Sequence, residues 1–242
     1  MTRGKKVVAF IEAFCLIPEG QFVGQPMKLL PFQKKFILDV YDNPSGTSRA
    51  YLSVARKNGK SALIAAILLA HIVGPEAKQN SQIVSGARSR EQAALVFKLA
   101  EKMVRLSPQL SEIVRVVPSS KMLVGLVMNV EYKAISAEAN TAHGLSPVLA
   151  ILDEVGQVRG PQDSFIEAIE TVIGWMTQQT PRIGVLLAMF TPRQRIARLA
   201  IKNRGARQTL RLESFGRCKT WPTLQNRRRG CLQRRIVSAG YT

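Results

Sequence analysis

The chain has 242 residues, of which 46% are apolar, and a formal net charge of +19 at pH 7. This apolar content supplies a substantial core and excludes fibrous, collagen-like and fully disordered proteins. The longest apolar run, residues 62–73, is far shorter than the roughly 20 residues that cross a bilayer, so no membrane is expected as a partner. The N-terminal segment has no small-residue cleavage site, which favours a cytoplasmic protein. The three cysteines and two histidines lack metal-ligand spacing, so neither zinc nor disulfide bonds are expected to organise the fold.

Residues 49–190 alternate apolar runs suited to buried strands with segments of helical periodicity. In chain order, the sequence predicts a strand at 50–54, a helix at 60–73, a strand at 82–87, a helix at 88–106 and shorter strands at 113–117, 122–128 and 130–135. There follow a strand at 148–152, a helix that opens at the capping box formed by Ser164 and Glu167, and a last strand at 184–190. This order predicts an α/β fold, in which helices cover both faces of a mostly parallel sheet.

From Thr191 to the C-terminus the pattern changes. These 52 residues contain 14 Lys and Arg against a single acid, Glu213, so they carry +13 of the total charge. Apolar residues occur only in short pairs, and no regular element is expected there. The sequence therefore divides into an N-terminal lead-in at 1–48, a core at 49–191 and a poorly ordered, arginine-rich tail at 192–242.

The sharpest motif is Gly59-Lys60-Ser61, which falls between the strand at 50–54 and the helix at 60–73. In this context the loop amides and the helix N-terminus converge on a phosphate, Lys60 neutralises its charge and Ser61 ligates Mg²⁺. The first glycine of the usual phosphate loop is missing, because Val54 stands there. The triplet alone is as often a solvated turn, and its place between strand and helix favours phosphate binding.

Two acids, Asp153 and Glu154, follow the buried strand at 148–152. At the carboxyl edge of a parallel sheet, the first acid would hold Mg²⁺ through water and the second would polarise an attacking water. Taken alone, such a run more often leads into an exposed loop. The pair of motifs, in this order and about 90 residues apart, is what favours nucleotide hydrolysis.

Two further polar residues fit the same chemistry. Gln33 lies in a Leu-Pro-Phe-Gln segment, and its amide can donate to and accept from an adenine edge at once. Thr191 follows the strand at 184–190, where a hydroxyl could sense the γ-phosphate. Taken alone, Gln33 would be an exposed residue at a helix start and Thr191 a strand-end cap.

These motifs resemble, in order and spacing, the N-terminal ATPase half of the terminase large subunit of tailed phages, the motor that packages DNA into procapsids. The resemblance covers most of residues 8–191, through segments at 10–43, 49–72, 86–97 and 136–156 and the strand before Thr191. It implies a P-loop ATPase fold, ATP and Mg²⁺ as ligands, and a place in the host-cell cytoplasm. The implied partners are double-stranded DNA, a portal protein, a small terminase subunit and further copies of the chain in a homo-oligomeric ring.

The resemblance also accounts for the missing glycine, because terminases have a deviant phosphate loop with a basic residue early in it. Arg56 is implied to contact the γ-phosphate or to order the loop, and a guanidinium suits phosphate oxygens. By the same resemblance, the loop residues Lys57, Asn58, Gly59, Lys60 and Ser61 bind phosphate, Gln33 belongs to the adenine motif, Asp153 and Glu154 are the Mg²⁺-holding and water-activating acids, and Thr191 belongs to the coupling motif. Arg88 and Arg90 are candidates for a contact with DNA or a neighbouring subunit.

The chain departs from the resemblance after Thr191. Large terminases continue into a nuclease that holds two metals with several carboxylates, and the tail offers only Glu213, so no nuclease activity is expected here. One hypothesis is that the tail is an out-of-frame translation after an insertion or deletion near codon 190 of a decayed prophage gene. The rival hypothesis is a genuine basic extension that binds phosphate backbones.

Two other functions remain open from the sequence. Another P-loop nucleic-acid motor, such as a helicase, would need further aromatic and arginine-rich strand motifs, which residues 1–190 do not contain. A non-functional prophage remnant, whose tail binds nucleic acid unspecifically or does nothing, is the alternative to a working ATPase.

Overall fold

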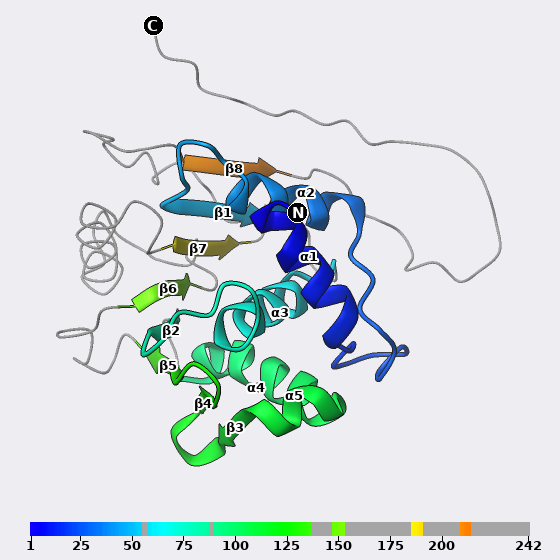
Figure 1. Cartoon of the computed structure of the whole chain (residues 1–242), viewed down its shortest axis with the longest axis vertical. Helices are drawn as coiled ribbons and strands as arrows, with labels where there is room; N and C mark the ends of the chain where they lie inside the picture. Colours follow the sequence, from blue (N-terminus) through cyan, green and yellow to red (C-terminus); the bar gives the residue numbers. More distant parts are fainter. Residues whose placement is uncertain (55–57, 88–89, 137–146, 153–184, 191–208, 214–242) are drawn as a thin grey trace, which may run out of the picture.

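The computed structural model describes residues 1–54, 58–87, 90–136, 147–152, 185–190 and 209–213. The strands of this described part form one sheet (Figure 1). They are β1 Arg49–Ser53, β2 Gln82–Ala87, β3 Val114–Val117, β4 Met122–Gly125, β5 Val130–Ser136, β6 Pro147–Leu152, β7 Val185–Phe190 and β8 Thr209–Glu213. The helices are α1 Arg3–Phe14, α2 Pro31–Tyr41, α3 Lys60–Ile72, α4 Arg90–Leu106 and α5 Pro108–Ile113, with a short 3-10 turn, η1, at Pro118–Ser120.

The sheet is mixed, with the strand order β3-β4-β5-β2-β6-β7-β1-β8. The strands from β5 to β8 in this order pair in parallel, and β3, β4 and β5 pair antiparallel at one edge. Parallel pairs need crossover connections, while the antiparallel edge is joined by short turns. The predicted α/β fold with a mostly parallel sheet flanked by helices is therefore confirmed.

Helix α3 lies at the centre of the core because it is apolar all round. Every residue from 63 to 72 is buried, His71 included. A helix that is apolar on all faces must be covered on all faces. Its neighbours are α1, α4 and the strands β4 and β5, and α4 packs in turn on β2 and β5.

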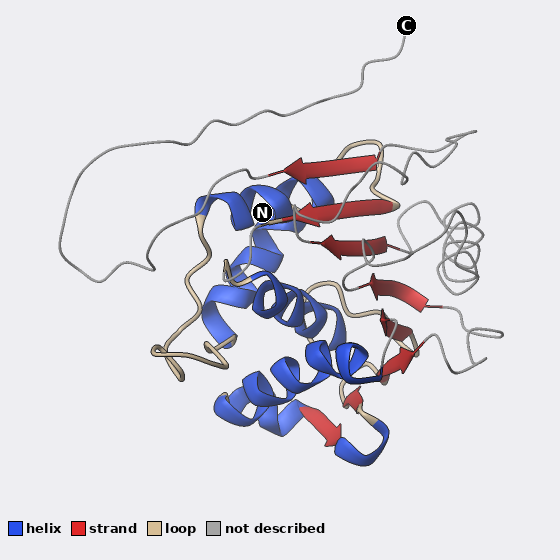
Figure 2. Ribbon diagram, turned by 180° about the vertical axis from the view of Figure 1, so that it is seen from behind, coloured by secondary structure: helices blue, strands red, loops and turns tan. Residues whose placement is uncertain are grey.

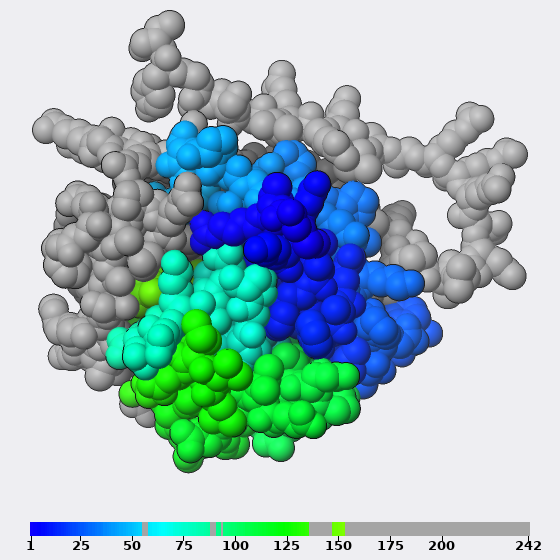
Figure 3. Space-filling model, in the orientation of Figure 1, coloured from blue at the N-terminus to red at the C-terminus, as the bar shows by residue number. Residues whose placement is uncertain are grey.

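The N-terminal lead-in is folded onto this core. Helices α1 and α2 pack on each other, and α1 also packs on α3. Ile11 of α1 and Ile37 of α2 are fully buried. In Figure 3, α1 covers the surface between the residues of α2 and those that follow α3. The sequence did not predict α1, and the lead-in is an integral layer of the domain.

Most predicted boundaries agree with the structure to within one or two residues. The strand predicted at 122–128 is the exception, because β4 ends at Gly125. The chain then turns back into β5, and Asn129 takes a left-handed backbone angle, φ 49°. Leu126 and Val127 are 52% and 69% exposed at this turn. The apolar residues 126–128 therefore belong to a hairpin tip and not to the strand.

Helix α2, helix α5 and strand β8 were not predicted either. Helix α5 occupies residues that precede the strand predicted at 113–117, so β3 begins one residue later, at Val114. Strand β8 lies in the tail, where no regular element was expected, and that expectation was wrong for residues 209–213. The sequence Thr-Leu-Arg-Leu-Glu alternates polar and apolar residues, which is the signal of a half-buried strand. The helix predicted after Ser164 lies outside the described residues.

No helix in the described part of the chain is long and apolar enough to cross a membrane.

Candidate nucleotide-binding site

The predicted phosphate loop joins the end of β1 to the start of α3. Strand β1 is buried up to Ser53, and Val54 after it is also buried. Residues 58–62 are half-buried, whereas α3 is buried from Leu63 onward. The junction is therefore the partly exposed point between a buried strand and a buried helix. A phosphate from solvent can reach the chain there.

Gly59 is the N-cap of α3 and has a left-handed backbone conformation, with φ 69° and ψ 18°. A glycine adopts this conformation without the steric cost that a Cβ would add. The amide of Leu63 donates to the Gly59 carbonyl at 2.9 Å and so closes the first helical turn. The glycine allows the chain to turn sharply from the loop into the helix.

The N-terminus of α3 suits an anion. No side chain caps the helix at Gly59, and its first turn contains no acidic residue. The first amides of a helix have no partner within the helix, and the helix dipole makes this end positive. Lys60 and Ser61 begin the same turn. The first backbone amides of α3 and the residues Lys60 and Ser61 thus lie at one helix end, where a phosphate can bind.

Gln33 reaches this junction from another helix. It lies in the first turn of α2 and is only 4% exposed. Its Oε1 accepts a hydrogen bond from the Leu30 amide at 2.9 Å. Its Nε2 lies 3.5 Å from the position that a Cβ on Gly59 would occupy. The predicted adenine-binding residue and the predicted phosphate loop are therefore neighbours, although 26 positions separate them in sequence.

The strands that lead to the other predicted residues end at the same edge of the sheet. Strand β7 lies between β1 and β6, and all three run parallel (Figure 1). Phe190 pairs with Ser53, while Leu152 pairs with Ala188, so β6 ends two residues short of β7. At about 4.8 Å per strand, β6 lies roughly 10 Å from β1. This carboxyl edge is where parallel sheets bind ligands.

Of the predicted site residues, the structure brings Gln33 and Gly59 together and places Lys60 and Ser61 at the same helix end. Asn58 precedes them in the loop and is half-buried. The other predicted residues, Arg56, Lys57, Asp153, Glu154 and Thr191, lie outside the described residues, as does Arg88. Arg90 begins α4. Among the residues described, no group of three or more His, Cys, Asp and Glu could hold a metal ion.

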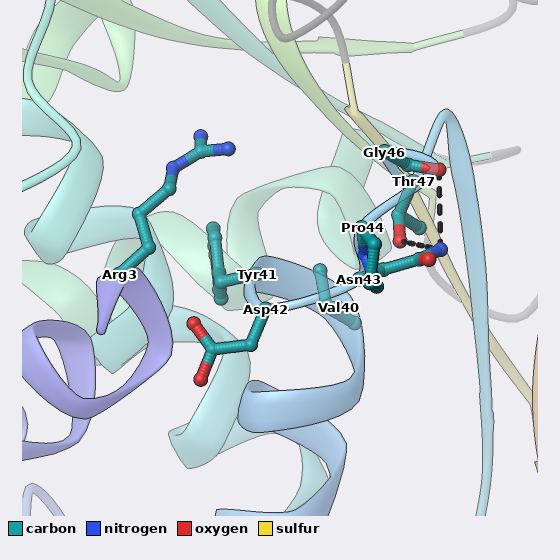
Figure 4. A pocket seen from close by; sticks show the side chains of 8 residues that line it. All are labelled: Arg3, Val40, Tyr41, Asp42, Asn43, Pro44, Gly46 and Thr47. Atoms are coloured by element: carbon teal, nitrogen blue, oxygen red, sulfur yellow. Dashed lines mark hydrogen bonds between the residues drawn. The ribbon is translucent and has the colours of Figure 1, made fainter.

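A separate cavity of about 240 Å³ lies near the amino end of β1, opposite the end that leads into the phosphate loop (Figure 4). It is lined by Arg3, Val40, Tyr41, Asp42, Asn43, Pro44, Gly46 and Thr47. Five strand residues, or about 17 Å, separate it from the phosphate loop. Asn43 donates to the Gly46 carbonyl and to the Thr47 hydroxyl, both at 3.1 Å. The cavity is therefore separate from the predicted nucleotide-binding residues.

Beside this cavity a buried polar cluster joins α1, α2 and the end of α3. Tyr41 Oη and His71 Nε2 share a hydrogen bond of 2.8 Å, and Arg3 Nε donates to Glu76 at 2.9 Å. Burial, with the charges of Arg3 and Lys78, lowers the pKa of His71 to about 3, so the ring is neutral. The hydrogen bond with Glu76 raises the pKa of Arg3. Helices α2 and α3 are thus joined by a hydrogen bond at one end, and at the other end Gln33 lies close to Gly59.

Comparison with known proteins identifies the family of this chain. The family model described as "Terminase large subunit, ATPase domain" matches residues 31–189. The terminase large subunit of Enterobacteria phage HK97 is 71% identical over 174 residues, which is 72% of this chain and 34% of that protein. The crystal structure of the HK97 large terminase superposes with a TM-score of 0.70 and 64% identity, over 78% of this chain and 38% of the other. The large terminase ATPase domain of Thermus phage P74-26 superposes with a TM-score of 0.49 and 17% identity, over 72% of this chain and 70% of the other.

This chain spans little more than a third of the length of its HK97 relatives. The family match covers the two elements that carry Gln33 and the phosphate loop, and it ends at the last residues of β7. The chain belongs to the family of terminase large subunit ATPase domains.

Proposed function

We propose that this chain binds and hydrolyses ATP with Mg²⁺ and is the motor part of a terminase that packages double-stranded phage DNA into procapsids. The observation that carries the proposal is the close approach of the Gln33 amide to Gly59 at the N-terminus of α3. It joins a group suited to adenine with a helix end suited to phosphate, in a chain of the terminase ATPase family.

The residues divide the nucleotide between them. Gln33 reads the adenine, and its Oε1 is held by the Leu30 amide so that its Nε2 has a fixed direction. The first amides of α3 and Lys60 take the phosphates, with Arg56, Lys57 and Asn58 in the same loop. A planar guanidinium at Arg56 would bind phosphate oxygens with two parallel hydrogen bonds.

Mg²⁺ suits this donor set. A Mg²⁺ ion that serves a nucleotide is typically held by one or two protein groups and the phosphates, so no preformed carboxylate cluster is needed. Ser61 at the start of α3 and Asp153 after β6 would hold it. Bound there, the ion would neutralise charge on the phosphate oxygens. Glu154 would orient the attacking water, and Thr191 would respond to the γ-phosphate from the end of β7.

Catalysis would then rest on positioning and electrostatics, because phosphoryl transfer asks for little covalent chemistry from the protein. The proposed boundaries are a lead-in at 1–48, an ATPase core at 49–191 and a basic tail at 192–242. The proposed partners are double-stranded DNA, a portal protein, a small terminase subunit and copies of the chain in a ring, in the cytoplasm of the host cell.

The test is a pair of variants in the full chain, with nucleotide binding and phosphate release measured separately. Lys60→Ala should abolish binding of ATP, and Glu154→Gln should keep binding while turnover stops. Lys98→Ala on the exposed face of α4 is the matched control for the loss of one lysine, and it should change neither quantity. If wild-type protein binds no ATP, or if Glu154→Gln hydrolyses ATP at the wild-type rate, the proposal fails.

A further inference from the structure

Strand β8 comes from the basic segment that follows the family match. It pairs in parallel with β1 along its whole length, from Arg49 opposite Thr209 to Ser53 opposite Glu213. Figure 1 shows it as the outermost strand next to β1, and Figure 2 shows both strands beside α2 from the other side. The match to the family ends at residue 189, so this strand is supplied by sequence outside it.

The position of β8 matters because β1 carries the phosphate loop. In a parallel ladder, alternate residues direct both N–H and C=O to one neighbour and the residues between them to the other. Strand β1 has β7 on one side and β8 on the other. Without β8, about half of the backbone groups of β1 would face outward, as a template for another strand.

Strand β8 is better suited than β1 to lie at the edge of the sheet. Strand β1 reads Arg-Ala-Tyr-Leu-Ser, with three successive apolar residues, and all but its first residue are buried. Strand β8 reads Thr-Leu-Arg-Leu-Glu and places a charge at its centre and another at its end. Charged residues on an edge strand discourage pairing with further chains.

Strand β8 also contacts α2, the helix that carries Gln33. Its last residue, Glu213, is level with Ser53, from which the phosphate loop departs. Eighteen residues connect β7 to β8. Because the strands are parallel, this connection must return about 17 Å along the strands and cross about 10 Å over β1. At up to about 3.4 Å per residue it can reach roughly 60 Å, so one chain can make this pairing.

We propose that residues 209–213 are a built-in edge strand of the nucleotide-binding sheet. They fix β1 at the start of the phosphate loop and prevent a second copy of the chain from pairing with it. The effect on nucleotide affinity rests on the proposed function, whereas the protection of β1 does not. The tail therefore has a structural task in the ATPase core, besides any charge that it offers to DNA.

The test is a series of single prolines in the full chain, Leu210→Pro, Arg211→Pro and Leu212→Pro. Proline removes an N–H, so it breaks the ladder where that N–H faces β1 and is tolerated where it faces solvent. The effect should therefore alternate, with Arg211→Pro differing from the other two. Ile236→Pro is the control, because it places a proline on an aliphatic position of the tail that follows β8 by 23 positions in the sequence.

Three measured quantities should differ between Arg211→Pro and the other two proline variants. Hydrogen exchange of the peptide that contains β1 should accelerate, while exchange of β2 and β5 stays slow and reports an intact fold. Light scattering should show self-association of the disruptive variants. Affinity for ATP should fall by roughly tenfold in the same variants. Ile236→Pro should match the unaltered chain in all three.

The outcomes are separable. The proposal is overturned if all three proline variants keep the wild-type hydrogen exchange of β1 and the wild-type molecular mass, or if all three change them equally. This holds whatever the affinity for ATP. If the unaltered chain is a stable dimer that the disruptive prolines dissociate, β8 pairs with a second copy and the intrachain role is overturned. If the unaltered chain binds no ATP, the proposed function fails, and exchange and mass still decide the role of β8.

Discussion

The side-chain Nε2 of Gln33 lies 3.5 Å from the point where a Cβ on Gly59 would stand, so the start of α2 lies close to the start of α3. At their far ends the same helices are joined by the hydrogen bond between Tyr41 and His71. A residue that would contact the base therefore also lies beside the loop that would contact the phosphates. Substitution of Gln33 or of Gly59 should therefore change the affinity for the nucleotide.

Replacement of Gln33 by Glu should reduce the preference for ATP over GTP. The substitution keeps the oxygen that accepts from the Leu30 amide and removes the NH₂ donor next to Gly59. Its new negative charge repels the phosphates of both nucleotides alike, so the ratio of the two affinities reports the lost donor alone. Competition binding of ATP and GTP measures this ratio. Gln21→Glu on the surface is the control, and an unchanged ratio in Gln33→Glu would contradict the adenine role.

Replacement of Gly59 by Ala should lower both stability and nucleotide affinity. The left-handed φ of 69° costs an alanine about 1 kcal/mol, even though the added Cβ has room beside Gln33. Gly20→Ala is the matched control, because Gly20 also has a positive φ, 93°, and an added Cβ meets nothing within 4 Å. Both variants should lose similar stability in urea unfolding, and only Gly59→Ala should lose affinity for ATP.

The core strands could be predicted because the apolar residues of each strand show in the sequence that it is buried. The run at 82–87 became β2 at the predicted residues, and the strand predicted at 148–152 became β6 with one added residue. Continuous apolar residues bounded by polar ones leave little choice of structure. Helix α1 and strand β8 were missed because their stability comes from the partners on which they pack, α2 and α3 for the one and β1 for the other.

The candidate site was predicted in part. The spacing of Gly59, Lys60 and Ser61 between a strand and a helix was enough to locate the start of α3. The contact between Gln33 and Gly59 could not follow from spacing, since the packing of α1 against both α2 and α3 brings these helix ends together. The parallel order of β1, β7 and β6 likewise depends on crossovers that a sequence pattern does not specify.

Loss of Arg3 should destabilise the protein by more than a surface ion pair would. The side chain of Glu76 is only 4% exposed, so Arg3→Met leaves a buried carboxylate without its cation. Because the Arg3 side chain is 36% exposed and screened in part, we expect a loss of about 2 kcal/mol, below the value for fully buried pairs. Urea unfolding of Arg3→Met, Glu76→Gln and the double variant measures the coupling. If Arg3→Met alone is as stable as the double variant, the buried pair does not contribute as inferred.

Acid should weaken the fold through His71. Its pKa is lowered to about 3 in the folded chain, chiefly by burial, whereas an unfolded histidine titrates near 6.5. Between these values the unfolded state binds a proton that the folded state does not, so the free energy of unfolding falls as the pH falls. The slope is about 1.4 kcal/mol per pH unit, or roughly 2 kcal/mol between pH 7 and pH 5. The contribution is fully present above pH 6.5.

Urea unfolding at pH 7, 6 and 5 measures this slope. His71→Gln should be less stable than wild type at pH 7, because it loses the packing of the ring beside Tyr41, and its stability should fall less steeply toward pH 5. The only other histidine, His143, supplies the control, and His143→Gln should keep the wild-type slope. Parallel pH profiles for wild type and His71→Gln would mean that the buried ring accepts its proton in the folded state, and the neutral bond to Tyr41 would then be the wrong description of this end of α3.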